Sequence, residues 1–231
     1  MLIIADKKIP KQAKANLLKY GKLVLLETSG ITEESISGHP DIFFCKTPEK
    51  LIIAPNTPII YKNNLLKNNI PFVEGKQNVG AEYPSAARYN VVITENCLIH
   101  RTDITDLSIL EQCENLKKIN VKQGFTRCSL LPLKNNYFIT SDEGIHRTLI
   151  EQEYNSLYVI PNDILLNGHK YGFFGGVCGV YENKIFILGS FNYFSEGEKV
   201  KLFTNKLGYE IIELYDGPLF DGGSIFFISI T

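Results

Sequence analysis

A short pattern that recurs four times is the strongest constraint on the fold of this chain. Each copy is a polar turn followed by three or four apolar residues, and the turns begin at residues 49, 96, 135 and 183. Another strand-like run precedes each turn, at residues 41–44, 90–93, 128–131 and 176–180. Two such runs joined by a short polar turn predict a β-hairpin, so the chain contains four predicted hairpins.

Each predicted hairpin leads into a helix and then into a further strand. After the last hairpin, Ser195 and Glu198 match a capping box, and Gly208 supplies a C-terminal stop. The segments after Thr105 and Ser141 also place apolar residues at helical spacing. The weakest helix prediction covers residues 61–69, a short stretch rich in Asn. Together these features predict a repeated β-β-α-β unit.

A fifth unit is divided between the two ends of the sequence. Residues 224–230 form a predicted strand without a return partner, and residues 1–5 form one without a preceding partner. Pro10 stands at a predicted first helical position, and a strand at residues 22–27 follows. We therefore predict an α/β fold of one domain, residues 1–231, in which five units form a propeller closed by pairing of the terminal strands. The alternative is an ordinary α/β sheet with accidental periodicity.

The balance of charges and of apolar residues narrows the classes of function. Lys and Arg total 24 against 25 Asp and Glu, which makes nucleic acid an improbable partner. No apolar run approaches the roughly 20 residues that span a bilayer, so we expect no membrane partner. The first residues are apolar and lysines follow, which is the reverse of a signal peptide. The oligomeric state is left open.

The cysteines indicate a reducing compartment. There are five of them, an odd number at irregular spacing and without a C-x-x-C pair, which favours free thiols in a cytoplasmic protein. No His and Cys residues have zinc spacing, so we predict no metal and no cofactor. The abundance of Asn, Lys and Ile fits an AT-rich bacterial genome.

Several short segments, in their order and spacing, resemble known proteins. A ring of five β-β-α-β units is similar to the pentein fold of the guanidine-modifying enzymes, which include arginine deiminase, dimethylargininase and the amidinotransferases. It also resembles the ribosome anti-association factor, which shares that fold without being an enzyme. The closest resemblance is to an uncharacterised bacterial family assigned to the fold, through the segments HPDIFFCK, INVKQGFTRCS, TSDEG, GFFGG and DGGSIFF.

The resemblance implies a Cys nucleophile, a His that transfers protons and acidic residues that clamp a guanidinium group. Carried over by position, the thiol falls on Phe226, the histidine on Gln123, and the two acids on Lys46 and Thr47. None of these side chains can perform the corresponding step. The comparison therefore predicts that ordinary guanidine chemistry is absent.

Other polar residues are candidates for a binding or catalytic site at the mouth of the predicted pore. Cys128 is the best catalytic candidate because Lys122 and Arg127 could lower the pKa of its thiol; the alternative is a buried strand cysteine. His39 and Asp41 could bind a ligand or form an acid-base pair, or Asp41 could cap backbone amides beside a solvated His39.

Two further candidates complete the predicted ligand-binding set. Gln123 stands in a polar, flexible stretch, and Asp221 opens a strand of the fifth unit. The predicted ligand-binding residues are His39, Asp41, Lys122, Gln123 and Asp221. Asp142 and Glu143 instead fit a structural role in the first turn of a helix.

Three functions are compatible with this sequence. The first is binding of a small polar or zwitterionic ligand in the central pore without guanidine-modifying catalysis. The second is a hydrolase or transferase with relocated catalytic residues centred on Cys128. The third is a non-catalytic interaction protein similar to the anti-association factor, although its near-neutral charge disfavours a ribosomal partner.

Overall fold

The computed structural model describes residues 1–229, and within them the strands form five three-stranded sheets and one two-stranded sheet. In each three-stranded sheet the first strand is antiparallel to the second, and the second is parallel to the third. In this order, the sheets contain β17 (Phe226–Ile228), β1 (Leu2–Asp6) and β2 (Lys22–Leu26); β3 (Phe44–Lys46), β4 (Leu51–Ile53) and β5 (Phe72–Glu74); β6 (Val92–Ile93), β7 (Cys97–His100) and β8 (Lys117–Asn120); β9 (Leu130–Pro132), β10 (Tyr137–Thr140) and β11 (Asn155–Tyr158); and β13 (Cys178–Tyr181), β14 (Lys184–Ile187) and β15 (Glu210–Glu213).

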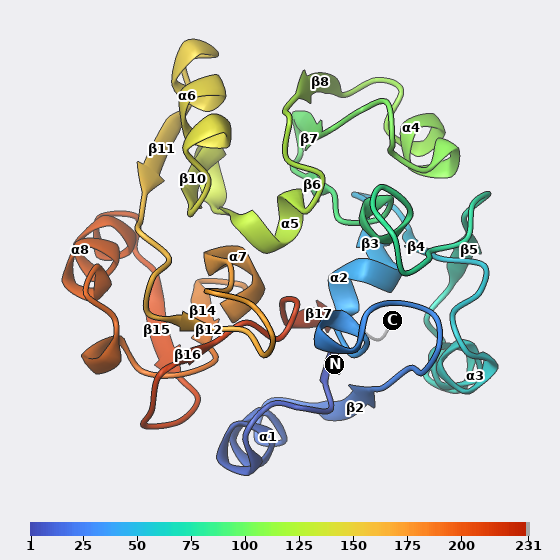
Figure 1. The fold of residues 1–231 in the computed structure, drawn as a ribbon, viewed down its shortest axis with the longest axis horizontal. Coiled ribbons are helices and arrows are strands. Elements are labelled where there is room, and N and C mark those ends of the chain that lie inside the picture. The colour runs from blue at the N-terminus through green and yellow to red at the C-terminus, as the bar shows by residue number, and fades with distance from the viewer. Residues whose placement is uncertain (230–231) are drawn as a thin grey trace.

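One helix connects the second strand of each sheet to the third. These helices are α1 (Lys11–Leu17), α3 (Ile59–Lys67), α4 (Leu107–Gln112), α6 (Glu143–Glu151) and α8 (Gly197–Lys206), and they lie around the outside of the molecule (Figure 1). Such crossovers are what parallel neighbours in a sheet require. The repeated β-β-α-β order predicted from the sequence is therefore present.

The pairing of β1 with β17 joins distant parts of the chain. Leu2 lies opposite Ile228, and Ile4 lies opposite Phe226, in antiparallel register. This pairing was predicted from the unpaired strands, although residue 230, the last of the predicted strand, lies outside the described residues. Each sheet is open, and no sheet closes on itself.

Three helical turns correct the predicted hairpins. Residues 41–43, 128–129 and 176–177 were predicted as strand, but they belong to α2 (Pro40–Phe43), α5 (Thr126–Ser129) and α7 (Phe174–Val177), and the first strands begin directly afterwards. These turns lie near the middle of the molecule (Figure 1). Their residues are almost all fully buried, so apolar character did not distinguish a buried turn from a buried strand.

Two helix starts also differ from the sequence predictions. α8 begins after Glu196 with no side-chain cap, so Ser195 and Glu198 form no capping box; the Ser195 backbone N–H instead donates to Asp163. α1 begins at Lys11, one residue after Pro10. Gly208 does end α8 with a left-handed φ of 73°.

The remaining elements connect the repeats. They are the parallel pair β12 (Ile164–Leu165) and β16 (Leu219–Phe220) and the short 3-10 helices Glu34–Ile36, Ser85–Ala87, Lys134–Asn136 and Phe191–Tyr193. The buried apolar residues of the strands pack against the outer helices in three clusters. None of the helices in residues 1–229 has the length and apolar character that a membrane span requires.

Candidate functional site

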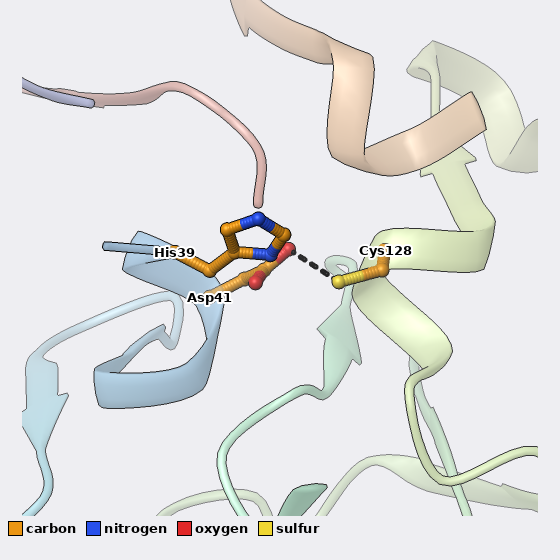
Figure 2. A group of neighbouring side chains, drawn as sticks. All are labelled: His39, Asp41 and Cys128. Atoms are coloured by element: carbon orange, nitrogen blue, oxygen red, sulfur yellow. Dashed lines mark hydrogen bonds between the residues drawn. The ribbon is translucent and has the colours of Figure 1, made fainter. Parts of the chain in front are cut away.

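Polar side chains from three repeats meet near the middle of the molecule. His39 precedes α2, Asp41 lies within α2, and Cys128 lies within α5 (Figure 2). Asp221 follows β16. All four side chains are buried. Equivalent positions of different repeats therefore bring an imidazole, two carboxyl groups and a thiol together, although these residues are far apart in the sequence.

A glycine allows the C-terminal loop to approach His39 closely. Gly223 has a φ of 64°, and a Cβ atom at this position would overlap the His39 side chain. Its carbonyl accepts a hydrogen bond of 3.1 Å from the Asp41 backbone N–H. Only glycine meets both the left-handed conformation and the close contact without strain. The Gly-Gly pair at 222–223 therefore ties this loop to α2.

Cys128 is a buried, hydrogen-bonded thiol. Its Sγ donates to Asp41 Oδ2 at 3.1 Å and accepts from Asn90 Nδ2 at 3.2 Å, while its backbone N–H donates to Asn90 Oδ1 at 3.0 Å. Burial and the nearby carboxylates of Asp41 and Asp221 raise the pKa of the thiol well above its usual value. The amide of Asn90 and the carboxyl of Asp41 thus fix the orientation of Sγ.

The expectation that Lys122 and Arg127 activate this thiol is wrong. Arg127 is itself buried, and its guanidinium donates to the carbonyls of Gly175, Leu130 and Cys178. The positive charge of Arg127 is therefore directed at backbone oxygens. The effect of burial dominates the pKa of the Cys128 thiol and raises it. A raised pKa means that the thiol, rather than the thiolate, is the resting form.

His39 is buried with neither ring nitrogen hydrogen-bonded within the described part of the chain. Its Nε2 lies 3.9 Å from Asp6 Oδ2, beyond hydrogen-bond distance, and the Asp221 backbone faces the ring without reaching hydrogen-bond geometry. Burial lowers the pKa of His39 to about 3, and the charge of Lys8 adds to this effect. The imidazole is therefore neutral. It is also buried, whereas one interpretation of the sequence had it exposed to solvent.

Burial also raises the pKa values of the neighbouring carboxyl groups. It raises the pKa of Asp6 to about 6 and that of Asp221 to about 7, and it raises the pKa of Asp41. Asp221 accepts backbone N–H groups from Phe173 at 2.8 Å and Gly223 at 3.0 Å. Ser224 Oγ donates to Asp41 Oδ2 at 2.7 Å, while Asp41 Oδ1 has no partner within residues 1–229.

His39, Cys128 and Asp221 line a single cavity of about 430 Å³. Aromatic side chains form much of its wall, and charged side chains stand at its rim. Sequence reasoning missed the aromatic wall residues Tyr83, Tyr171 and Phe173. They lie in segments between the repeats, where the sequence has no periodic pattern. The one signal in the sequence is that Tyr171 and Phe173 stand just before the glycine pair Gly175-Gly176.

Lys122 and Gln123 lie outside this cavity. They line a separate open depression of about 990 Å³ together with Asp142. Gln123 Nε2 donates to Asp142 Oδ2 at 3.2 Å, and Gln123 Oε1 accepts from the Phe125 backbone N–H at 3.0 Å. Asp142 also caps α6 by accepting from the Ile145 N–H at 2.8 Å, which is the structural role predicted for it.

Lys46 and Phe226 line a third space, of about 160 Å³, together with Arg127. Thr47 lies with Lys46 along another open depression, so none of the four positions matched to the guanidine chemistry lines the cavity that contains His39. The groups that do face it can hydrogen-bond a small molecule. One ligand atom each from His39, Asp41 and Cys128 also lie within 4.8 Å of one another, close enough to share an ion.

Solved structures of guanidine-modifying enzymes are similar to this chain in fold. A mutant of the Pseudomonas aeruginosa enzyme DDAH, complexed with citrulline, has a TM-score of 0.56 at 13% identity, over 92% of this chain and 91% of that one. The agmatine deiminase of C. jejuni has a TM-score of 0.56 at 12% identity, over 92% and 74% of the two chains. An amidinotransferase of the saxitoxin pathway of Microseira wollei has a TM-score of 0.57 at 11% identity, over 92% and 87%.

These structures establish the pentein fold that the sequence segments indicated. Identities of 11–13% establish the fold alone and say nothing about substrate or activity. No curated protein matches this chain in sequence. One family model does match, and it covers residues 4–226. The chain therefore belongs to the family of unknown function DUF6873.

Proposed function

We propose that this pentein-fold protein binds a small polar or zwitterionic molecule in the cavity lined by His39, Cys128 and Asp221. The observation that carries the proposal is an unpaired polar group, the His39 imidazole, in a cavity of about 430 Å³ with aromatic walls. Ligand sites are typically concave, largely apolar, and supplied with a few oriented polar groups. A ligand would satisfy the ring nitrogen, whose burial otherwise costs free energy.

We infer that the five sheets surround one axis as a closed propeller of a single domain. The same strand order in all five sheets supports this inference, as does the pairing of β1 with β17. The turns α2 and α5 lie near the middle of the view in Figure 1. The cavity would then lie at one end of the central axis.

The charges around the cavity suggest the chemical class of the ligand. Glu33 and Lys170 stand on its rim, so they can pair with a cationic and an anionic group of one molecule. Asp221 in the floor can accept hydrogen bonds from a nitrogen-rich group, and the walls supply aromatic surface for a planar one. The similar structures bear the names of enzymes for dimethylarginine and agmatine, and one contains citrulline. Guanidino and ureido amino acids and amines are therefore the first ligands to test.

We further propose that ordinary guanidine-modifying catalysis is absent. Cys128 with a raised pKa and His39 with a lowered pKa favour a thiol beside a neutral imidazole. Guanidine chemistry of this type requires the thiolate and a protonated histidine. Burial disfavours both charged forms.

The second candidate is a hydrolase or transferase centred on Cys128. One observation favours it: the Cys128 thiol lines one cavity with the His39 imidazole and the Asp221 carboxyl group, and it donates a hydrogen bond to the Asp41 carboxyl group. Such a reaction needs the thiol proton to move to a base as the sulfur attacks, and the Asp41 carboxylate, which accepts the Sγ–H hydrogen bond, is placed to take it. Release of citrulline, ornithine or ammonia from the same compounds distinguishes this candidate from binding alone.

We also propose that the protein works in the bacterial cytoplasm. All five cysteines are free thiols and buried, which is the state that a reducing compartment maintains.

The experiment is a thermal-shift screen of arginine, citrulline, agmatine and methylated arginines, followed by calorimetric titration of each hit. Tyr171→Ala removes an exposed cavity wall and should weaken binding about 10-fold or more, since aromatic contacts contribute on the order of 1–3 kcal/mol. Tyr193→Ala is the matched control, because Tyr193 is also exposed, at 46% against 36% for Tyr171, but does not line the cavity. Equal loss in both variants, or no hit across the panel, contradicts the proposed ligand class.

A further inference from the structure

The buried trio His39, Asp41 and Cys128 has the composition of a transition-metal site. A thiolate, an imidazole and a carboxylate are the three protein ligands that zinc uses most often. Within residues 1–229 this is the one group of His, Cys, Asp or Glu side chains that could surround an ion with at least three ligands. The sequence places all three residues at the mouth of the predicted pore but predicts no metal, because residues from two repeats match no zinc spacing motif.

The distances are close to those of a tetrahedral site. Cys128 Sγ and Asp41 Oδ2 are 3.1 Å apart, and all three ligand atoms lie within 4.8 Å of one another. Around zinc, bonds of about 2.0–2.3 Å place ligand atoms roughly 3.3–3.8 Å apart. A side-chain adjustment of about 1 Å, estimated from the same bond lengths, would close the group around an ion.

Two of the three proposed ligand residues have polar atoms without a hydrogen-bond partner. Asp41 Oδ1 and both nitrogens of His39 are buried without hydrogen-bond partners in residues 1–229. Figure 2 shows one ring nitrogen of His39 directed toward the Asp41 carboxylate and the other directed away. Buried polar atoms are nearly always paired, and a bound ion is one of the recognised reasons for an exception.

The neighbouring residues would orient each ligand. Asn90 holds Cys128 through both its amide nitrogen and its amide oxygen. Ser224 Oγ donates to Asp41 Oδ2 and leaves Oδ1 free. The Nε2 atom of His39 faces the carboxylate of Asp6 at 3.9 Å, which resembles the carboxylate–histidine–metal arrangement of many zinc proteins.

The local charges permit a dication. A thiolate and a carboxylate would neutralise an ion of charge +2, and Asp6 and Asp221 add further acidic groups nearby. Arg127 opposes them, but its guanidinium donates to carbonyl oxygens of Gly175 and Cys178, which keeps its positive end occupied.

We propose that His39 Nδ1, a carboxylate oxygen of Asp41 and Cys128 Sγ bind one divalent transition-metal ion, with zinc as the best match. Binding replaces the proton of the Cys128 S–H···O bond: the S–H bond breaks, the metal–sulfur bond forms, and H⁺ leaves to solvent. No redox change is involved. Three protein ligands leave a fourth position for water or a bound molecule, and His39 and Cys128 both line the cavity.

Both proposals use the His39 imidazole, so the ion is tested alone, without the organic ligand, and either proposal can fail without the other. The full chain is freed of metals with a chelator and titrated with Co²⁺, whose thiolate complexes have characteristic charge-transfer absorption. We expect one ion per chain and displacement by Zn²⁺. Cys128→Ser should abolish the thiolate band and weaken binding at least 100-fold, and His39→Gln should weaken it comparably.

Cys113→Ala is the control, because Cys113 is a buried thiol in an apolar cluster away from the site. It should bind Co²⁺ as the wild type does. Thermal unfolding of each variant checks that it is folded.

X-ray absorption of the zinc-loaded wild type gives a second readout that needs no variant. It should show one sulfur at about 2.3 Å and nitrogen or oxygen at about 2.0–2.1 Å. A first shell without sulfur, a stoichiometry well below one ion per chain, or unchanged binding in folded Cys128→Ser would overturn the proposal.

Discussion

The helical turns α5 and α7 occupy the same place in their repeats but are built from opposite kinds of residues. α5 carries Arg127 and Cys128, whereas α7 carries Gly175 and Gly176. The two turns pack directly against each other: a Cβ on Gly175 would overlap the carbonyl of Arg127. One turn thus supplies functional groups, and the other supplies the space that they need.

Gly176 shows why this division matters for the site. Its missing side chain leaves room for the Asp221 carboxyl group, which would overlap any Cβ placed there. The Gly176 carbonyl also accepts the backbone N–H groups of Gly222 and Ser224. The same position in the repeat therefore carries polar side chains in α5 and glycines in α7. A side chain placed at the glycine positions of α7 should destabilise the fold.

The largest expected effect comes from Gly176→Ala. The added methyl group has no free space beside Asp221, so we expect a loss of about 3 kcal/mol or more in the free energy of unfolding. Chemical denaturation measures this loss. Gly144→Ala, at the start of the outer helix α6, is the control: its added methyl group would meet only the partly exposed side chain of Asp142, at 3.1 Å from Oδ1, so stability should change by less than about 1 kcal/mol. Similar stabilities for the two variants would show that α7 does not need glycine.

The next effect is expected for Arg127→Met, which removes the link between the two turns. Three backbone carbonyls would lose a buried donor, and we expect a loss of about 2–3 kcal/mol. Urea unfolding provides the measurement. Arg147→Met is the matched control, because Arg147 lies on the surface with Glu143 and should change stability little. If both substitutions had the same small effect, Arg127 would not connect α5 to α7.

The smallest effect separates two buried cysteines. Cys178 lies in an apolar cluster, so Cys178→Ser should cost about 1–3 kcal/mol by burying a hydroxyl group without a good partner. Cys128→Ser should cost less than about 1 kcal/mol, because Asp41 and Asn90 remain to bind the hydroxyl. Thermal unfolding of the two variants at one pH gives the comparison. A larger loss of stability in Cys128→Ser than in Cys178→Ser would mean that Asp41 and Asn90 do not stabilise a serine hydroxyl at position 128.

The repeat pattern was sufficient to predict the strands and the outer helices. Short polar turns and the two unpaired end strands are local features, so they could be found in the sequence. The central turns were missed because Asp41 is followed by apolar residues that suit a strand as well as a buried turn. Whether such a segment forms a helical turn or a strand depends on the residues that pack against it, and these residues come from distant repeats.

The candidate site could be predicted only where the repeat logic applied. His39, Cys128 and Asp221 stand at corresponding places in different repeats, and the structure brings them to one cavity. Gln123 lies only five residues from Cys128, yet its hydrogen bonds to Asp142 and Phe125 turn it into another depression. The direction in which a side chain points depends on such local contacts, and the spacing of residues in the sequence does not reveal them.

The antiparallel pairing of β1 with β17 has a consequence for how the protein is made. Ile4 cannot meet Phe226 until nearly all of the chain between them has left the ribosome, and at typical rates of synthesis this takes on the order of 10–50 s. During that time one edge of β1 lacks its neighbour and remains open to other strands. Completion of this sheet is therefore a late, long-range event, and the nascent chain has the greatest need of a chaperone before it occurs.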